Sequence, residues 1–223
     1  MRRPLVLCPL AVEAAAFARF GKTRVEQIGG GAAAVERAFL RLRGENCPSF
    51  VLLFGLAGAL DPSFATGAAF VIGSVHSDSL PHAPTLHAPL LNSRCLPTPP
   101  TARIIECPAP VATVSEKAAL AAATNGQLVD MESYTFATCA SQLGIPWAIV
   151  RAVSDSAREA LPCEVLSFID GQGNTRVLRV LSALVRRPQL LPQLLALHHA
   201  SKHALREGAF LADAICCAQE VEP

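Results

Sequence analysis

Residues 128–137 read LVDMESYTFA, in which an apolar pair is followed by Asp130 and Glu132 on either side of Met131. The apolar pair has the character of a short strand, and residues 131–143 have the pattern of a helix. Carboxylates at such a junction are costly to bury without partners, so these two side chains need a purpose. The segment is therefore predicted to be a strand that ends in carboxylates and is followed directly by a helix.

The same alternation of short apolar runs and helical patterns extends in both directions from this unit. Strands are predicted at residues 5–8, 23–28, 50–54, 68–75, 103–107, 111–114, 127–129 and 147–153, and helices at 11–20, 32–43, 116–123 and 131–143. Residues 76–100, rich in Pro, Ser and His, are expected to form a loop or lid, and two helices split near Pro188 and Pro192 close the chain. This alternation predicts an α/β fold with helices on both faces of a sheet.

Composition limits the class of protein. The 223 residues are 51% hydrophobic, which suits one domain over residues 1–223, with the C-terminal helices beginning at about residue 176. No apolar run reaches the roughly 18 residues of a membrane span, and the net charge of +1 argues against a nucleic-acid surface. The eight cysteines form no C-x-x-C pair and no zinc spacing, so we expect a reduced, cytoplasmic protein without a metal site.

Ligands of such sheets bind outside the carboxyl ends of the strands, so the residues there are the first candidates. They are Pro9–Glu13, Gly29–Gly31, Gly55–Gly58, Asp130–Ser133 and Ser154–Ser156. The Gly29–Gly31 turn opens a helix and exposes N–H groups that suit an anion, although a turn that only starts a helix fits equally well. The small residues at 55–58 permit close approach of either a ligand or a packed helix.

Some of the carboxylates at these strand ends fit both a structural and a functional interpretation. Asp130 fits a plain helix N-cap, and Glu132 fits either an outward first-turn residue or an acceptor for two vicinal sugar hydroxyls. Ser156 and Glu159 fit a capping box, which leaves Asp155 free to project into a cleft as an acid or hydrogen-bond partner. The alternative is that Asp155 is an ordinary cap. Glu13 alone would be an ordinary residue of a first helical turn.

Five segments match, in the same order, the motifs of one enzyme superfamily. They are LAVE (10–13), GGGAAA (29–34), GLAGAL (55–60), VDMES (129–133) and VRAVSD (150–155). Over roughly residues 4–160 the chain resembles the nucleoside phosphorylase and nucleosidase superfamily. The resemblance implies a single three-layer α/β/α sandwich with a mixed sheet, and an enzyme that cleaves an N-glycosidic bond.

The resemblance also implies roles for individual residues. Met131 and Glu132 would hold the ribose, Asp155 would protonate or hydrogen-bond the purine at N7, and Glu13 would position the attacking water. The candidates for loops that contact the base or phosphate are Gly29, Gly30, Gly31, Gly55, Ala57, Gly58, Thr113 and Ser115. No metal and no cofactor are expected, and inorganic phosphate is a candidate co-substrate. Hydrolysis and phosphorolysis both stay open, because CPLAVEA carries no Arg after the first strand.

The C-terminal part, from ALPCEV to SKHAL (160–205), resembles the hopanoid-associated phosphorylases. This implies adenosylhopane as substrate, with release of adenine. Residues 176–206 carry six basic and no acidic side chains, and their leucines fall on one helical face, so we expect peripheral contact with the inner membrane surface. A homo-oligomer is expected. The alternatives are a methylthioadenosine or adenosylhomocysteine nucleosidase and a non-catalytic nucleoside-binding module.

Overall fold

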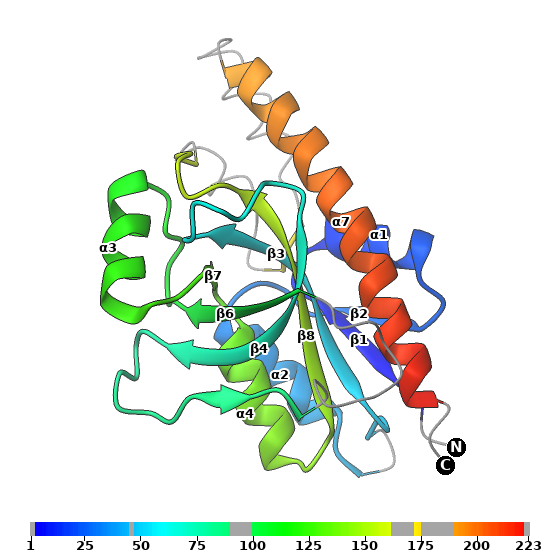
Figure 1. Cartoon of the computed structure of the whole chain (residues 1–223). Coiled ribbons are helices and arrows are strands. Elements are labelled where there is room, and N and C mark those ends of the chain that lie inside the picture. The colour runs from blue at the N-terminus through cyan, green and yellow to red at the C-terminus, as the bar shows by residue number, and fades with distance from the viewer. Residues whose placement is uncertain (1–2, 45–46, 90–99, 162–171, 175–189, 221–223) are drawn as a thin grey trace.

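The computed structural model describes residues 3–44, 47–89, 100–161, 172–174 and 190–220 (Figure 1). Eight strands form one mixed sheet. They are β1 (Leu5–Cys8), β2 (Arg24–Gln27), β3 (Val51–Ala59), β4 (Ala69–Ser77), β5 (Leu86–His87), β6 (Thr101–Glu106), β7 (Leu128–Asp130) and β8 (Trp147–Asp155). The mixed sheet of an α/β fold is therefore confirmed.

The centre of the sheet closes on itself. Strand β3 pairs with β8, β8 with β4, β4 with β6, β6 with β7, and β7 returns to the end of β3. Strands β1 and β2 extend the sheet from β3 through parallel pairs. Because β3 takes part in three pairings, its last residues lie beside the ends of both β7 and β8. Gly58, for example, pairs with Val129 on one side and with Asp155 on the other.

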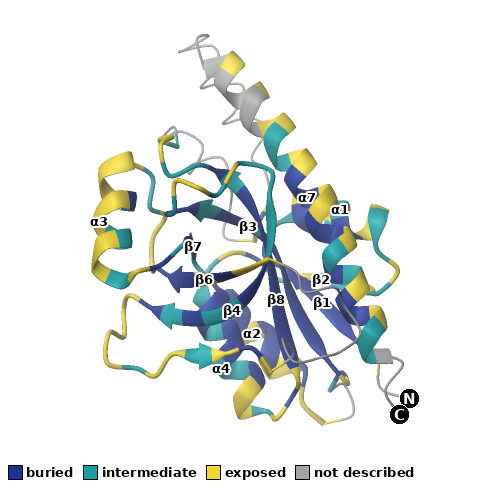
Figure 2. Ribbon diagram, in the orientation of Figure 1, coloured by how far each residue is buried: buried dark blue, intermediate teal, exposed yellow. Residues whose placement is uncertain are grey.

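Helices cover both faces of the sheet (Figure 1). Helices α2 (Ala32–Arg41) and α4 (Ser133–Gln142) pack on one face, and α1 (Ala11–Phe20) and α7 (Leu190–Glu220) on the other. Alternate residues of β3 supply the two cores, with Val51 and Leu53 on one side and Leu52 and Phe54 on the other. This double burial explains the unbroken apolar run of the central strand, and Figure 2 shows β1, β3 and β8 buried accordingly.

Three of the sequence-based predictions were wrong in detail. Residues 111–114 are not a strand, because Thr113 caps α3 (Val114–Thr124) in a capping box with Glu116. Strand β3 does not end at residue 54 but continues through the small residues to Ala59. Ser156 begins a turn and not a helix within residues 156–161, although the Glu159 carboxylate accepts the Ser156 N–H at 3.1 Å as a capping box requires.

The end of the chain forms one long helix in the described part. Helix α7 begins at Leu190, and Pro192 lies in its first turn, where a missing N–H is tolerated. The helix therefore runs through one of the two proline positions where a split was predicted, and residues 175–189 lie outside the described residues. No helix in the described part of the chain is long and apolar enough to cross a membrane.

Helix α7 rests on the sheet through a close contact at Gly208. A Cβ at this position would lie 2.8 Å from Cε2 of Phe54, so only glycine permits this approach. Phe54 also meets Phe17 of α1, with ring centroids 5.7 Å apart. Phe54 therefore joins the sheet to both helices of this face.

Replacing Phe54 with Ala should lower the free energy of unfolding by about 3–5 kcal/mol, because the lost ring leaves a cavity between the sheet, α1 and α7. Denaturant unfolding measures this difference. Leu40→Ala is the control, because Leu40 is 60% exposed and its loss should change stability by less than about 0.5 kcal/mol. Similar losses in the two variants would contradict this packing.

Candidate active site

A cavity of about 470 Å³ opens at the ends of β1, β3, β7 and β8. Its walls come from the start of α1, the turn before α2, the second half of β3 and the junction of β7 with α4. The lining residues are Pro9, Leu10, Glu13, Gly30, Gly31, Leu56, Ala57, Gly58, Ala109, Pro110, Val111, Val129, Asp130, Met131, Glu132, Ser154, Asp155, Leu161 and Ser201. Most of these are apolar or small, and the four charged ones are all carboxylates.

Glu13 lies in the first turn of α1 and is only 2% exposed. Its Oε2 accepts the Leu10 N–H at 2.7 Å, and its Oε1 accepts the Leu56 N–H at 2.8 Å. Burial raises the pKa of Glu13 to about 7, against the opposing effects of Arg151 and the two N–H donors. A carboxyl group that titrates near neutrality suits a general base.

Arg151 lies on β8 and is completely buried beneath the cavity. Its Nη2 lies 2.5 Å from Oδ2 of Asp130 and 3.3 Å from Oε2 of Glu132. Burial lowers the pKa of Arg151, but Asp130, Glu132 and Glu13 more than offset this, so its pKa lies above the ordinary value. A single cation therefore faces three carboxylates.

The two carboxylates of the DME segment are held in different ways. Oδ1 of Asp130 accepts the Ser133 N–H at 3.2 Å, so Asp130 contacts the first residue of α4 and also pairs with Arg151, although the N-cap position of the helix is Glu132. Oε1 of Glu132 accepts the Gly31 N–H at 2.7 Å. Burial raises the pKa of Glu132, and the neighbouring Asp130 raises it further. The prediction of Asp130 as the helix N-cap was wrong by two residues, and its carboxylate instead lines the cavity beside Arg151.

The glycines at the strand ends differ in what they contact. Gly31 has a φ of +84°, which favours glycine, and its N–H is turned toward Glu132. Gly30 and Gly31 line the cavity, whereas Gly29 does not. A Cβ on Gly55 would lie 2.5 Å from Nη1 of Arg151 and 2.6 Å from Oε1 of Glu13. Gly55 therefore makes room for the charged cluster and is absent from the cavity wall.

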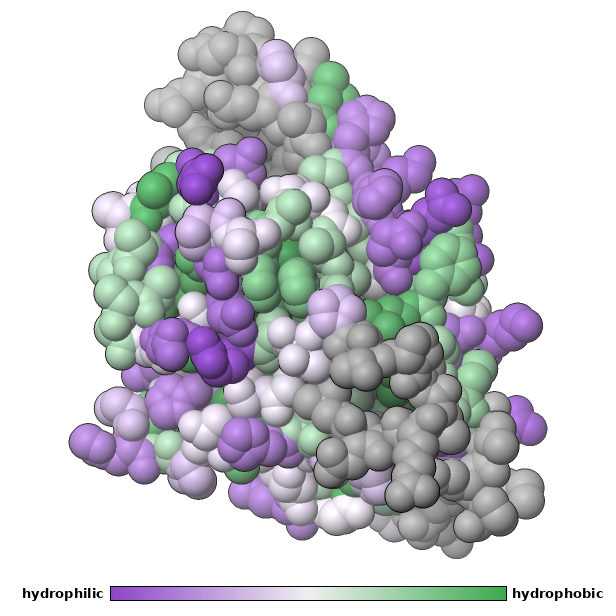
Figure 3. All heavy atoms as spheres, viewed as in Figure 1, coloured by the Kyte–Doolittle hydropathy of each residue, from purple (hydrophilic) through white to green (hydrophobic). Residues whose placement is uncertain are grey.

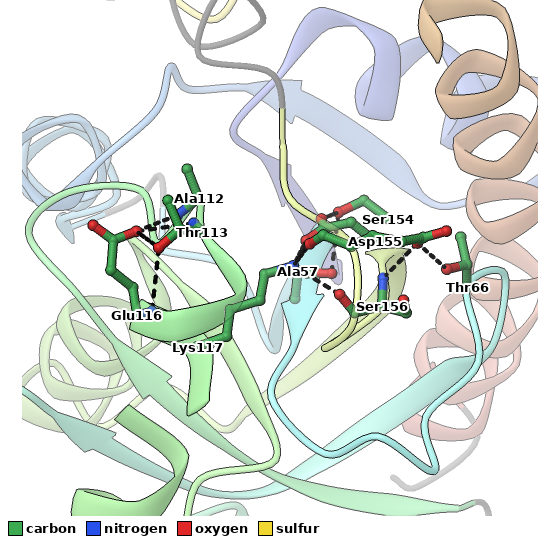
Figure 4. A network of polar contacts seen from close by, with 10 residues as sticks. Ala57, Thr66, Ala112, Thr113, Glu116, Lys117, Ser154, Asp155 and Ser156 are labelled. Carbon is green, nitrogen blue, oxygen red and sulfur yellow. Dashed lines mark hydrogen bonds and ion pairs between the residues drawn. The ribbon is translucent and has the colours of Figure 1, made fainter. Parts of the chain in front are cut away.

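Asp155 ends β8 and is 3% exposed at the cavity wall. Its Oδ2 is paired with Nζ of Lys117, and its Oδ1 accepts a hydrogen bond from the Ser154 hydroxyl (Figure 4). Lys117 projects from α3 and is completely buried. The Asp155 carboxylate is thus held from two directions.

The structure brings together most of the predicted site residues. Those that line the one cavity are Glu13, Gly30, Gly31, Ala57, Gly58, Met131, Glu132 and Asp155. Thr113 and Ser115 lie instead at the start of α3, where the Thr113 hydroxyl accepts the Glu116 N–H at 3.2 Å. Both are exposed and absent from the cavity wall.

Sequence reasoning missed two charged residues of this region. Arg151 stood inside the VRAVSD motif, and an arginine within a buried strand is a signal that a charge partner lies nearby. Lys117 gave no such signal, because KAALAAAT looks like an ordinary amphipathic helix with an exposed lysine. Its role depends on contacts 38 residues away in the sequence.

A comparison with protein families decides the membership of this chain. A family model described as the phosphorylase superfamily matches residues 17–186. The chain belongs to the phosphorylase superfamily. This confirms the predicted superfamily and the predicted enzyme class, that of nucleoside phosphorylases and nucleosidases. No curated protein matches the sequence.

Solved structures share the fold at low sequence identity. Futalosine hydrolase of Helicobacter pylori is 12% identical with a TM-score of 0.65, and the match covers 98% of this chain and 97% of the hydrolase. The methylthioadenosine/adenosylhomocysteine nucleosidase of Colwellia psychrerythraea, in complex with adenine, is 13% identical with a TM-score of 0.65 over 97% and 95% of the chains. The corresponding nucleosidase from S. pneumoniae, with a transition-state inhibitor, is 14% identical with a TM-score of 0.66 over 97% and 99%.

Replacing Arg151 with Met should destabilise the protein by about 3–5 kcal/mol at pH 8, because it leaves buried carboxylates without their cation. The loss should be smaller at pH 5, where Glu13, with its pKa near 7, is protonated and no longer needs a counter-charge. Urea unfolding at the two pH values measures both.

The matched control is Arg41→Met, which removes an arginine from the surface pair with Glu26. Exposed pairs contribute roughly 0–1 kcal/mol, so this variant should unfold almost as the wild type does at either pH. An Arg151→Met protein as stable as the Arg41→Met protein would show that the buried cluster is not held by its guanidinium.

Proposed function

We propose that this enzyme cleaves the N-glycosidic bond of an adenosine-type nucleoside, and that water is the nucleophile. One observation carries the proposal: four carboxylates converge on a largely apolar cavity, at the positions where the superfamily resemblance requires a ribose clamp, a water-positioning base and a base-side hydrogen-bond partner. The similarity to nucleosidases that act on adenosine-type nucleosides supports this substrate class.

Three of the four carboxylates have a chemical task at such a bond. Glu132 keeps lone pairs beyond those used by Gly31 and Arg151, and these can accept the two vicinal hydroxyls of a ribose beside Met131. Asp155, in its protonated form, donates its carboxyl proton to the purine as the C1′–N9 bond breaks and the electron pair of that bond passes to the base, which leaves an Asp155 carboxylate beside Lys117. Glu13 accepts the proton of the water that attacks C1′.

The charge of the cavity favours water over phosphate. Glu13, Asp130, Glu132 and Asp155 line it, and no Lys, Arg or His is among its described lining residues. Arg151 lies beneath and is already surrounded by three carboxylates. A phosphate dianion entering such a cavity would be repelled, whereas a neutral water molecule would not. Of hydrolysis and phosphorolysis, the two reactions that the sequence leaves open, we therefore propose hydrolysis.

The finer substrate assignment rests on the C-terminal segment. Its resemblance to hopanoid-associated phosphorylases supports adenosylhopane, a nucleoside with a large apolar group at the 5′ carbon. Leu10, Pro110, Val111 and Leu161 give the cavity wall apolar surface. The exposed Lys202 and Arg206 belong to the basic segment for which membrane contact is expected, and hydrophilic side chains lie along the outward side of α7 in Figure 3.

A substrate panel tests the reaction and the substrate together. Purified protein is incubated with methylthioadenosine, adenosylhomocysteine, futalosine and detergent-solubilised adenosylhopane, each with and without phosphate, and both products are analysed by mass spectrometry. Release of the free base with a free ribosyl product, at a rate independent of phosphate, is the expected result. A ribose 1-phosphate product would replace hydrolysis with phosphorolysis, and no base release from any substrate would refute the proposed function.

Replacing Asp155 with Asn should lower turnover by roughly 10²–10⁴-fold, because an amide cannot give an acidic proton to the departing base. Steady-state kinetics on the best substrate of the panel, with circular dichroism to confirm folding, measures the effect. Asp61→Asn is the control, because Asp61 hydrogen-bonds Ser63 at the surface and does not line the cavity. Near-normal turnover of a folded Asp155→Asn protein would remove Asp155 from this role.

The pH profile of turnover should have an acidic limb near pH 7. Burial raises the pKa of Glu13 to about 7, and the ionised form is the one that accepts a proton from water, so activity should fall as the pH drops below 7. Burial also raises the pKa of Glu106 to about 7, but Glu106 accepts hydrogen bonds from Thr135 and does not line the cavity.

Two variants separate these carboxyl groups. Glu106→Gln should keep the acidic limb, whereas Glu13→Gln should lower turnover and leave no limb near pH 7. The stabilisation that a raised carboxyl pKa gives the folded state at pH 5 is lost as the pH rises through 7, and unfolding measurements can follow this loss. If the Glu13→Gln variant kept the acidic limb near pH 7, that limb would belong to another titrating group.

A further inference from the structure

The only residue that helix α3 buries is a lysine. Among residues 114–124, Lys117 alone is counted as buried, and it is 0% exposed. Lysine is almost never fully buried unless it is paired, because removing its ammonium group from water costs several kcal/mol. Such a residue, on a helix whose other side chains are half-buried or exposed, requires a specific partner.

Three acceptors surround the ammonium group. Nζ of Lys117 is paired with Oδ2 of Asp155, and it donates to the carbonyl oxygens of Ser156 and Glu159, each at 2.8 Å. An ammonium group has three N–H donors, so all of them are used. Figure 4 shows the lysine side chain extending from α3 to the end of β8, where Asp155 and Ser156 meet it. These three contacts together fix the position of the ammonium group.

The same contacts close the turn that follows Asp155. The Glu159 carboxylate accepts the Ser156 N–H at 3.1 Å and lies 3.4 Å from the Thr66 hydroxyl. On the other side of Asp155, the Ser154 hydroxyl lies between Oδ1 of Asp155 and the carbonyl oxygen of Ala57, 3.2 Å away. The Asp155 carboxylate is held between a cation on one oxygen and a hydroxyl on the other, with its remaining lone pairs available to the cavity.

We infer that Lys117 is a positioning residue for the base end of the site: it holds Asp155 and the turn of residues 156–159 as one unit against α3. This inference rests on the proposed cleavage of a nucleoside. Lys117 does not line the cavity, so it acts through Asp155 and does not touch the substrate. Its fixed positive charge stabilises the carboxylate that Asp155 becomes when its proton passes to the purine and the C1′–N9 bond breaks.

The test compares Lys117→Met, Lys117→Arg and the double variant Lys117→Met/Asp155→Asn with the wild type. Lys22→Met, which removes an exposed lysine between α1 and β2, is the control and should behave as the wild type. Because Lys117 acts through Asp155, Lys117→Met should lower kcat by roughly 10²-fold with a change in KM of less than about threefold. Lys117→Arg should recover part of kcat because it restores the charge.

The double variant separates positioning from a merely structural role. If Lys117 works only through Asp155, adding Lys117→Met to Asp155→Asn should cost less than about threefold in kcat. The double variant also removes the unpaired buried carboxylate, so it should fold even if Lys117→Met alone does not. A folded Lys117→Met enzyme with kcat within about threefold of the wild type would overturn the inference, and so would a double variant that multiplies the two single losses.

Two different measurements test the proposed function and the role of Lys117. Turnover by the wild type decides whether the enzyme cleaves nucleosides at all. Calorimetric binding of free adenine needs no turnover: Lys117→Met should weaken it by about tenfold, and Lys22→Met should leave it unchanged. Unchanged adenine binding by a folded Lys117→Met protein would overturn the positioning role even if the wild type proved inactive on every nucleoside tested.

Discussion

The candidate site depends on one buried guanidinium. Arg151 enters the core on a fully paired strand, where its charge would be unstable without neighbours, and it in turn makes Asp130, Glu132 and Glu13 tolerable at the inner end of the cavity. Four groups from three segments of the chain are therefore interdependent. The carboxylates have their counter-charge only when β8, the junction of β7 with α4, and the first turn of α1 are all in place.

The closed pairing of the central strands explains why these segments meet. Strand β3 carries the ends of β7 and β8 on its two sides, and Gly55 lets the guanidinium and the Glu13 carboxylate lie directly against it. In an open sheet, residues at neighbouring strand ends would spread along one edge. Here they point into one enclosed space, so carboxylates that are far apart in the sequence act on one ligand.

The sequence predicted the order and kind of most elements, because apolar runs buried on both faces are unambiguous in strands such as 51–54. It also predicted Glu13, Glu132 and Asp155, since strand ends and motif spacing locate them without a structure. It failed where a local pattern was ambiguous: the apolar VATV run suggested a strand, although Thr113 and Glu116 form a capping box. It also failed for Lys117, because the partner of a buried charge is set by tertiary contacts and leaves no periodic signal.

The alternation of core residues along β3 limits how this family of sequences can change in length. Odd-numbered residues at 51 and 53 belong to the layer under α2 and α4, and even-numbered residues at 52 and 54 to the layer under α1 and α7. A single inserted residue before Gly55 would exchange the occupants of the two layers and carry the glycine away from Arg151. Length variation among relatives of this chain should therefore collect in the connections, and the register from residue 51 to residue 55 should remain free of insertions even where the amino acids themselves diverge.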